Sequence, residues 1–285
     1  MTATISRLAA PSRKAAEVLE RAATDHRAKT RRNRLTIQLG TIALALGIML
    51  FWQFVLVHLV NPRYISNPVE VLTRLFELIA EGDIGRHVYV TLLEAGSGFV
   101  IGVTLGLSAA FGLAMTKRGY DVVEPFLIAF YSIPKIALAP LFILWFGLGV
   151  TSKILLAALM VFFIVFMNTV AGIRTIQPGL INVSRMFGAT KRDLARKIML
   201  PAAAPAILAS VRITFTRAIE GAVLAEFIAA TEGLGFVIVR ASRSFDIPSV
   251  FAGILIIAIV VMTANALLRV LQSRLTPWHT GEVHG

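Results

Sequence analysis

Residues 36–60 read TIQLGTIALALGIMLFWQFVLVHLV and carry no formal charge at neutral pH over 25 consecutive positions. A helix rises about 1.5 Å per residue, so a helix of this length crosses the roughly 30 Å hydrocarbon core of a bilayer with some tilt. The run begins too late in the chain for a cleavable signal peptide, whose apolar region is short and lies near the N-terminus. It therefore predicts a membrane-spanning helix that is retained in the protein.

The segment before this run, residues 1–34, is strongly basic. It holds nine Lys and Arg residues against three acidic ones. The net positive charge of this segment is therefore half of the net charge of +12 on the 285-residue chain. We interpret it as a cytoplasmic tail. It is either a solvated segment that fixes topology or an arm that contacts anionic lipid headgroups. Residues 35–285 are then the predicted membrane domain.

The composition of the whole chain also indicates a membrane protein. Apolar residues make up 56% of the chain and charged residues 15%, whereas ordinary soluble domains have about half and a quarter. This balance argues against a soluble enzyme and against a nucleic-acid partner. The chain has no cysteine, which excludes disulfides, thiolate zinc sites and cysteine nucleophiles. Five further apolar stretches follow the first, at about 88–115, 122–147, 152–173, 204–231 and 249–271.

Lys and Arg residues are distributed unevenly between the loops that join these stretches. With the N-terminus inside, 19 of them lie on the cytoplasmic side and six on the outer side. This bias predicts an all-α polytopic membrane protein with six transmembrane helices and both termini in the cytoplasm. The third stretch is interrupted by Pro125, Pro134 and Pro140. The last two free the backbone carbonyls four residues earlier, at Phe130 and Ile136.

The second apolar stretch contains a row of glycines. Gly98, Gly102 and Gly106 form two overlapping small-xxx-small steps. Such a row lets another helix backbone approach closely in lipid, where the hydrophobic effect does not drive helices together. The row predicts a helix-packing face, and the general abundance of glycine in membrane helices is the alternative explanation.

Ionisable residues inside the apolar stretches are candidates for function, because a charge at mid-bilayer costs about 2.5–3.5 kcal/mol. The fifth stretch contains four of them, Arg212, Arg217, Glu220 and Glu226. On a helix these four share about half of the circumference, and Arg217 can pair with Glu220 three residues later. That face is predicted to look into protein or water. The ionisable residues inside or at the edges of the stretches are Glu94, Lys135, Arg212, Arg217, Glu220, Glu226 and Glu232.

Lys135 lies at the break in the third stretch, after Ser132 and Pro134. It is interpreted either as a cation that attracts an anionic solute or as a lysine that snorkels or pairs with a glutamate such as Glu94. A broken helix at this depth is tolerated only where protein or a cavity satisfies the free backbone groups. The candidate translocation-pathway residues are Ser132, Pro134, Lys135, Arg217, Glu220 and Glu226.

Motifs for catalysis and nucleotide binding are absent from the sequence. There is no G-x-x-x-x-G-K-[ST], H-E-x-x-H or G-x-S-x-G pattern, and the five histidines are scattered. The chain is therefore predicted to have no catalytic residues, no metal site and no nucleotide site of its own. If it moves a solute uphill, the energy comes from an ion gradient or from another polypeptide.

Between the fourth and fifth stretches, residues 182–201 read NVSRMFGATKRDLARKIMLP. Basic and apolar side chains alternate at helical spacing, and a proline ends the segment. The pattern predicts a short amphipathic helix outside the bilayer at about 184–198, with Gly188 allowing a tight bend near its start. Such a helix lies on the membrane surface or docks into a groove of a partner.

This segment resembles the permease subunits of ATP-binding-cassette importers. Their signature is E-A-A, then a glycine, then Ile-x-Leu-Pro, and Gly188, Ile198, Leu200 and Pro201 match it in type and spacing. Asn182-Val183-Ser184 stands where the family has E-A-A. The ATPase-coupling residues that the resemblance implies are Asn182, Ser184, Arg185, Phe187, Gly188, Ala189, Leu194, Ile198, Leu200 and Pro201.

The likeness extends over about residues 65–272. Residues 133–149, and Ala225-Glu226 followed by Gly233-Leu234-Gly235, are similar to permeases of the nitrate/sulfonate/taurine type. The resemblance implies a type I importer fold, so that residues 35–285 form a transmembrane permease domain whose coupling helix lies at about 184–198.

The resemblance also implies the assembly and the activity. The permease would be a homodimer in the bacterial inner membrane, with two cytoplasmic ATPase subunits and an extracytoplasmic substrate-binding protein. It would translocate a small anionic solute by alternating access, and it would not be an enzyme itself. ATP and Mg would bind to the partner ATPases, with no cofactor on this chain. The alternative hypothesis is a stand-alone secondary transporter or channel for a small anion.

Overall fold

The structure, a computed structural model, describes residues 36–61, 64–116 and 119–275. Within these ranges the secondary structure is helical and contains no strand. The chain divides into two units, Met1–Pro68 and Val69–Gly285, which we describe separately. The basic tail expected at residues 1–34 lies outside the described residues.

The first unit contains the membrane-length helix that the uncharged run predicts. Thr36–Val55 is a candidate span of 20 residues with a mean hydropathy of 1.7. The helix continues as a π-helical turn, η1 (Trp52–Leu56), and as α2 (Val57–Leu59). The Trp52 indole nitrogen Nε1 donates a hydrogen bond of 2.8 Å to the carbonyl oxygen of Ser66, so the chain after the span folds back toward its end.

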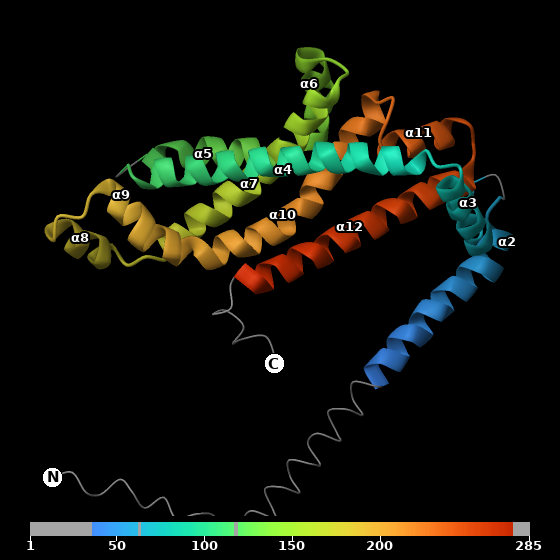
Figure 1. Cartoon of the computed structure of the whole chain (residues 1–285), viewed down its shortest axis with the longest axis horizontal. Coiled ribbons are helices and arrows are strands. Elements are labelled where there is room, and N and C mark those ends of the chain that lie inside the picture. Colours follow the sequence, from blue (N-terminus) through green and yellow to red (C-terminus); the bar gives the residue numbers. More distant parts are fainter. Residues whose placement is uncertain (1–35, 62–63, 117–118, 276–285) are drawn as a thin grey trace, which may run out of the picture. The chain divides into compact units, whose positions relative to one another are not determined.

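The second unit, with α3 starting at its boundary, contains the other membrane-length helices. Long α-helices alternate with short helical segments that turn the chain at the two ends of the bundle (Figure 1). The elements are α3 (Pro68–Ala80), α4 (Ile84–Ala114), α5 (Gly119–Ser132), η2 (Lys135–Leu138), α6 (Ala139–Phe146), α7 (Val150–Arg174), α8 (Pro178–Met186), α9 (Lys191–Asp193), η3 (Leu194–Met199), α10 (Leu200–Ala229), α11 (Leu234–Arg243) and α12 (Ile247–Leu275).

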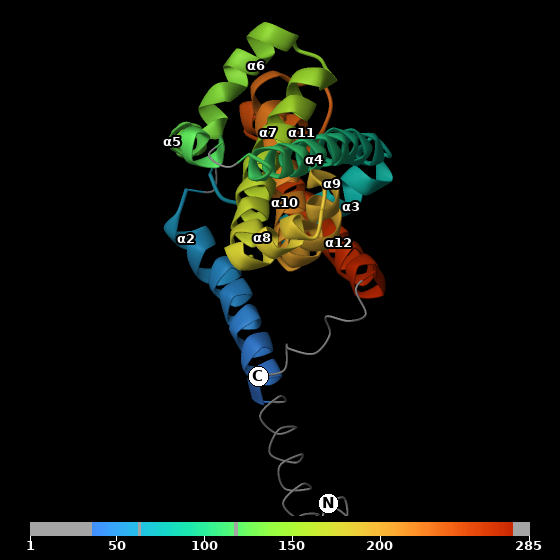
Figure 2. The same ribbon diagram turned by 90° about the vertical axis from the view of Figure 1, so that its left-hand side faces the viewer.

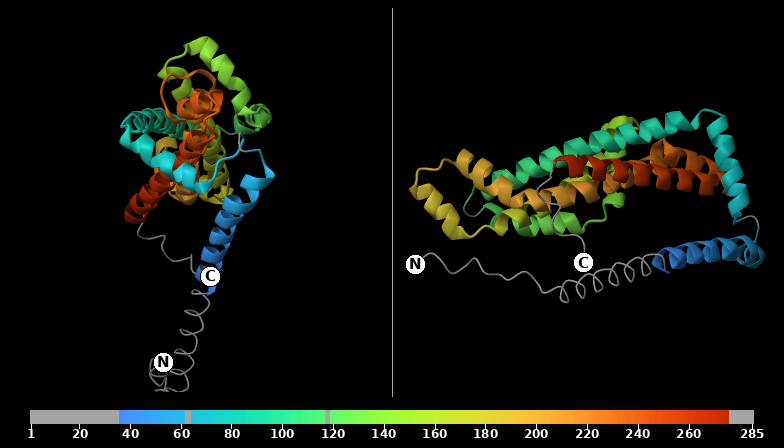
Figure 3. Two further views of the ribbon diagram at one scale, coloured as in Figure 1. Left: turned by 90° about the vertical axis from the view of Figure 1, so that its right-hand side faces the viewer. Right: turned by 60° about the horizontal axis from the view of Figure 1, so that its bottom comes forward.

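Helices α4, α7 and α10 pack against one another and form the core of the second unit (Figure 3). The buried side chains where they meet are small, and Ala95, Ala157, Ala218 and Ala222 have no exposed surface. Small side chains allow close approach of helix backbones, which favours association through van der Waals contact. The core therefore depends on fit between backbones as well as on burial of large apolar groups.

The glycine row of α4 lies directly against α7. A Cβ atom added at Gly98 would lie 2.6 Å from the Cβ of Ala157, and one at Gly102 would lie 2.6 Å from the carbonyl oxygen of Ala158. At Gly106 the nearest atom would be the carbonyl oxygen of Phe162, at 3.0 Å. Side chains are excluded at these positions because the α7 backbone occupies the space they would need.

The predicted spans correspond to helices, with one exception. Five helices of the described chain are long and apolar enough to cross a membrane, and a bent pair brings the number up to six. The pair is Gly119–Ser132 with Lys135–Phe146, which meet at an angle of 85°. The third predicted span is thus a broken helix rather than a straight one, and Figure 2 shows α5 and α6 as separate arms.

The break occurs at Pro134 and leaves no freed carbonyl without a partner. The amide of Ile133 donates to the carbonyl oxygen of Phe130 at 3.3 Å. The amide of Ala139 donates to the carbonyl oxygen of Ile136. Bonds between residues three apart thus replace the two helical bonds that the prolines remove.

The loops of the second unit gather at two ends of the bundle. Helices α8 and α9 lie at one end, which we call the coupling end, and α3 and α11 lie at the other, which we call the far end (Figure 1). At the far end α3 is held to the start of α12, because the Arg74 nitrogen Nε donates to the hydroxyl oxygen of Ser249 at 2.8 Å. Arg74 also forms an ion pair of 2.9 Å with Glu77. The hydrogen bond within this Arg74–Glu77 pair is the main reason that the pKa of Arg74 is raised.

Candidate functional site

The coupling end is built around a turn at Gly188. Gly188 has a φ of +82°, a left-handed conformation that glycine adopts without steric cost. Its amide donates to the carbonyl oxygen of Arg185 at 3.0 Å, and the amide of Ala189 donates to that of Ser184 at 3.0 Å. These two bonds form a Schellman motif, which ends α8 and reverses the chain.

A second helix begins immediately after the turn. The hydroxyl oxygen of Thr190 accepts a hydrogen bond from the amide of Asp193 at 3.2 Å, and the Asp193 carboxylate accepts one from the amide of Thr190 at 3.2 Å. This reciprocal capping box starts α9, which continues through η3 into α10. An ion pair of 2.8 Å between Asp193 and Lys197 supports the first turns.

The prediction of a single amphipathic helix at about 184–198 is therefore wrong. Helix α8 ends at Met186, and the residues from Lys191 onward belong to the start of the long α10 rod. The physical reason is that Gly188 and Thr190 supply a helix stop and a helix start only two residues apart. The segment is a helix–turn–helix, and its tip is the turn.

The tip exposes two large apolar side chains. Met186 is 86% exposed and Phe187 is 89% exposed. A shallow hollow beside the tip is lined by residues from both sides of the turn, including Ser184, Asp193 and Ile198. Apolar side chains this exposed at the end of a rigid turn are typical of a docking surface for another protein.

The predicted coupling residues fall into three groups by exposure. Asn182, Arg185, Leu200 and Pro201 are exposed, as are Phe187 and Gly188, whereas Ser184, Ala189 and Ile198 are partly buried. Leu194 is only 3% exposed and packs inside the unit. Leu194 therefore stabilises the start of the long rod and does not present a surface to a partner.

A buried ion pair joins α4 to α7 toward the far end. The ammonium Nζ of Lys153 lies 2.8 Å from the carboxylate oxygen Oε1 of Glu94. The side chains are 6% and 0% exposed, respectively. Lys153 lies in the first turn of α7. The signal that could have found it is Glu94, a carboxylate in an apolar stretch that needs a cation nearby.

Lys135 does not pair with Glu94. Its ammonium donates to the carbonyl oxygen of Tyr131 at 2.9 Å. It also lies over two aromatic rings, 4.5 Å from the centroid of Tyr131 and 5.3 Å from that of Phe163. Cation–π contacts and a carbonyl thus hold this lysine at the break, near Ser132 and Pro134.

Glu226 is buried where α10 ends and α11 begins. Its carboxylate accepts hydrogen bonds of 2.6 Å from the hydroxyl of Thr91 and from the amide of Gly235. The Thr91 oxygen in turn accepts a bond of 2.8 Å from the amide of Leu234. Gly233 has a φ of +108°, and a Cβ atom there would lie 2.2 Å from the Glu226 carboxylate. The Gly233-Leu234-Gly235 sequence is thus explained by the need to wrap the backbone around this carboxylate.

Arg217 and Glu220 pair with each other, as the sequence predicts. Their side chains are 2.7 Å apart and are 50% and 45% exposed. Arg212, five residues before Arg217 on α10, is also exposed. Because charges are costly against lipid, this face of α10 must be covered by protein or by water in the membrane.

The six predicted pathway residues do not form one cluster in the described part of the chain. Lys135 contacts α5 and α7, the Arg217–Glu220 pair lies on the exposed face of α10, and Glu226 is bonded inside the far end. Among the described residues, no group of three or more His, Cys, Asp or Glu side chains is arranged to hold a metal ion. The arrangement is that of a membrane transport permease with an exposed apolar turn at one end.

The family of the chain follows from comparison with known proteins. Residues 102–278 match the family "Binding-protein-dependent transport system inner membrane component". The chain belongs to this family, whose members are the permease subunits of bacterial ATP-binding-cassette importers. It is a membrane permease subunit. Membership of the family implies that it works with ATPase and substrate-binding proteins.

Two relatives and one solved structure illustrate the similarity. The taurine transport system permease protein TauC of Escherichia coli (strain K12) is 34% identical over 259 residues, covering 88% of this chain and 92% of that protein. The riboflavin transport system permease protein RibX of Chloroflexus aurantiacus is 34% identical over 241 residues, covering 84% and 90%. The crystal structure of a bacterial ABC transporter that imports the acidic polysaccharide alginate matches with a TM-score of 0.58 at 16% identity, covering 87% of this chain and 99% of that chain. The fold is that of type I importer permeases.

Proposed function

We propose that this chain acts as one half of a homodimeric permease that imports a small organic anion. Two cytoplasmic ATPase subunits, which would hold ATP and Mg, drive it, and an extracytoplasmic binding protein delivers the solute. The observation that carries the coupling part of this proposal is the exposed turn of Met186 and Phe187 at the coupling end. The similarity to permeases named for taurine and for aliphatic sulfonates supports a solute with a sulfonate group.

The turn is suited to transmit force from an ATPase. The Schellman motif and the capping box fix its backbone on both sides, and the second helix continues directly into α10. A displacement of the tip therefore moves α10 as a rod. Met and Phe are apolar anchors of the kind that fill a groove in a partner.

The homodimer is supported by the charged face of α10. In a lone subunit the Arg217–Glu220 pair would face lipid, at a cost that a second subunit or a water-filled pathway removes. Two copies of this face, related by a twofold axis, would enclose a polar passage between them. Alternating access then consists of two arrangements of the same rigid subunits, biased by ATP on one side and by the loaded binding protein on the other.

The test compares two sources of energy. The permease is reconstituted in liposomes with its ATPase and binding protein, and ATP-driven uptake of radiolabelled taurine and ethanesulfonate is measured. The same permease alone is tested under proton and sodium gradients. We expect uptake only with the ATPase and ATP, and F187S should reduce both ATPase co-purification and uptake.

L105S is the matched control for F187S, because Leu105 is also a large exposed apolar residue but belongs to α4 and not to the turn. It should leave ATPase co-purification unchanged. Full uptake by the lone permease under an ion gradient would instead establish a secondary transporter and refute the proposal.

A further inference from the structure

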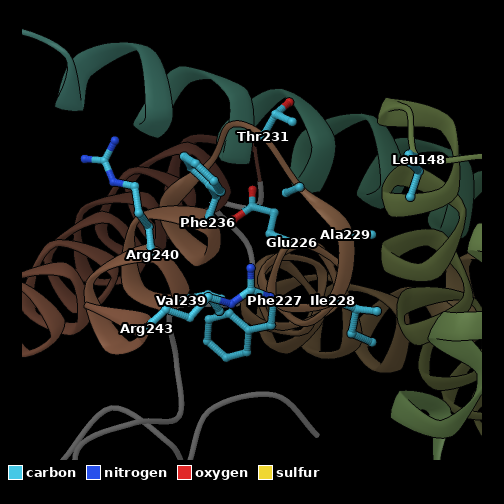
Figure 4. A pocket seen from close by; sticks show the side chains of 11 residues that line it. Leu148, Glu226, Phe227, Ile228, Ala229, Thr231, Phe236, Val239, Arg240 and Arg243 are labelled. Atoms are coloured by element: carbon cyan, nitrogen blue, oxygen red, sulfur yellow. The ribbon is translucent and has the colours of Figure 1, made fainter. Parts of the chain in front are cut away.

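The far end of the second unit contains a pocket of about 410 Å³ between Leu148 and two consecutive segments, the end of α10 and α11. Its walls come from Leu148 after α6, from the end of α10 and from α11 (Figure 4). The volume lies within the roughly 300–1,000 Å³ that is typical of sites for small molecules. The pocket lies at the opposite end of the bundle from the turn at Gly188.

Two arginines of α11 supply the positive charge of this pocket. Arg240 and Arg243 are three residues apart and both are exposed. In Figure 4 the Arg243 side chain extends across the pocket on the side of Phe227, whereas Arg240 extends along the other edge. The Arg240 guanidinium lies 5.7 Å from the centroid of the Phe236 ring. Like charges three residues apart on a helix repel each other weakly, and a bound anion would relieve that repulsion.

The other two arginines of the described far end have carboxylate partners. Arg74 forms ion pairs with Glu77 and Glu81, and Arg86 lies 2.5 Å from Glu232. In the described part of the chain no ion pair is formed by Arg240 or Arg243. The carboxylate that lines the pocket, Glu226, is already bonded to Thr91 and to the amide of Gly235.

The remaining walls of the pocket are mostly apolar. Phe227, Ile228, Phe236 and Val239 surround the space between the arginines and Leu148. Arginine binds oxyanion head groups through paired N–H donors, and an apolar wall accommodates a short hydrocarbon body. The lining therefore matches a molecule with one anionic head and a small apolar body.

The geometry points to a binding subsite for a small organic anion at the far end, with Arg240 and Arg243 as the residues that bind its sulfonate or carboxylate head. This inference rests on the proposed function, since it places the solute of that importer at the outer mouth of each subunit. It adds a site that is separate from the break at Lys135 and from the charged face of α10. The subsite would hold the anion after its release from the binding protein.

The test measures the accessibility of individual arginines. The complete transporter in lipid nanodiscs is treated with phenylglyoxal, and modification of each arginine is followed by mass spectrometry with ethanesulfonate, sodium sulfate or sodium chloride at equal ionic strength. We expect ethanesulfonate to slow modification of Arg240 and Arg243 but not of Arg86. Each of R240Q and R243Q should weaken the protection of the remaining arginine about tenfold, the loss expected for one charge-assisted hydrogen bond.

Two further variants separate the head group from the body. F227A should reduce protection by ethanesulfonate while leaving any protection by sulfate unchanged, because only ethanesulfonate has an apolar body. R86Q/E232Q removes a neutral ion pair at the same end of the bundle and should change neither. Equal protection by ethanesulfonate and chloride, or none by either, would overturn the inference.

The proposed function is tested separately in the same preparation. If ATP-driven uptake of taurine or ethanesulfonate is intact but Arg240 and Arg243 are not protected, the importer stands and the subsite is refuted. If the complete transporter shows no ATP-driven uptake, it is the proposed function that fails. If R240Q/R243Q weakens only the affinity for the binding protein, the arginines form a docking surface, and the subsite is again refuted.

Discussion

At the scale of single residues, Glu94 and Lys153 show how a charge is accommodated in the membrane region. The pair is buried, and within the described residues the second carboxylate oxygen of Glu94, Oε2, has no hydrogen-bond partner. Such a pair contributes little net free energy compared with two apolar side chains of similar size, but loss of one member leaves the other charge buried and unpaired. The pair should therefore be sensitive to single substitutions and tolerant of a matched double one.

We expect E94L and K153M each to lower the free energy of unfolding by about 3–5 kcal/mol, because each leaves one buried charge. The double variant E94L/K153M should recover most of that loss. Reversible unfolding of the purified permease in mixed detergent micelles measures both effects. K197M, which removes the cation of the exposed Lys197–Asp193 pair, is the control and should change stability little. A double variant as unstable as the worse single one would contradict this view of the pair.

At the scale of elements, the turn at Gly188 depends on one backbone conformation. Gly188 is left-handed, and a residue with a Cβ in that conformation costs roughly 1–2 kcal/mol, more when it is β-branched. A Cβ added at Gly188 would meet no atom within 4 Å, so the cost of a substitution is conformational rather than steric. The turn should therefore tolerate residues according to their left-handed propensity and not their size.

The expected order of function is G188N, then G188A, then G188V, because Asn enters the left-handed region more readily than Ala or Val. G188V should abolish ATPase co-purification and ATP-driven uptake while the permease still inserts in the membrane. G179A is the matched control, since Gly179 lies in α8 with no atom within 4 Å of an added Cβ and no left-handed φ. Unchanged uptake by G188V would refute the role of the turn in coupling.

At the scale of the whole second unit, the far end is tied together by buried polar bonds. Glu94 and Lys153 join α4 to α7, and Glu226 with Thr91 joins α4, α10 and α11. Helices bonded in this way move together. In the proposed homodimer, opening and closing of the pathway is therefore expected between the two subunits, along the face of α10 that carries Arg217 and Glu220, and not between helices of one subunit.

The absence of cysteine makes this expectation simple to test. We expect I213C to form disulfide-linked dimers in membranes under mild oxidation, because Ile213 is exposed beside the charged face of α10. L105C, on the exposed side of α4, should not. R217E should lower the yield of the I213C dimer by placing two acids together, and R217E/E220R should restore it. Equal crosslinking at both positions would show that α10 does not face the second subunit.

Much of the fold is predictable from local patterns. The length of the apolar stretches predicts the long helices α4, α7, α10 and α12 to within a few residues, because a bilayer needs a fixed helix length. The prolines predict where the third span breaks, although its 85° bend is known only from the structure. The helix–turn–helix around Gly188 was expected as one helix, because amphipathic periodicity continues across the turn and does not reveal the two caps.

The sequence alone identifies a helical membrane permease, and its patterns predict six spans, a basic cytoplasmic side and a partner-facing segment around Gly188. Charge bias, apolar length and motif spacing are properties of the chain and need no knowledge of neighbours. Three features are known only from the folded molecule: Glu94 is paired with Lys153, Glu226 holds the α10–α11 turn, and Arg240 and Arg243 share one pocket with Leu148. These contacts join residues distant in the sequence, and no periodicity along one helix specifies which side chains meet across several.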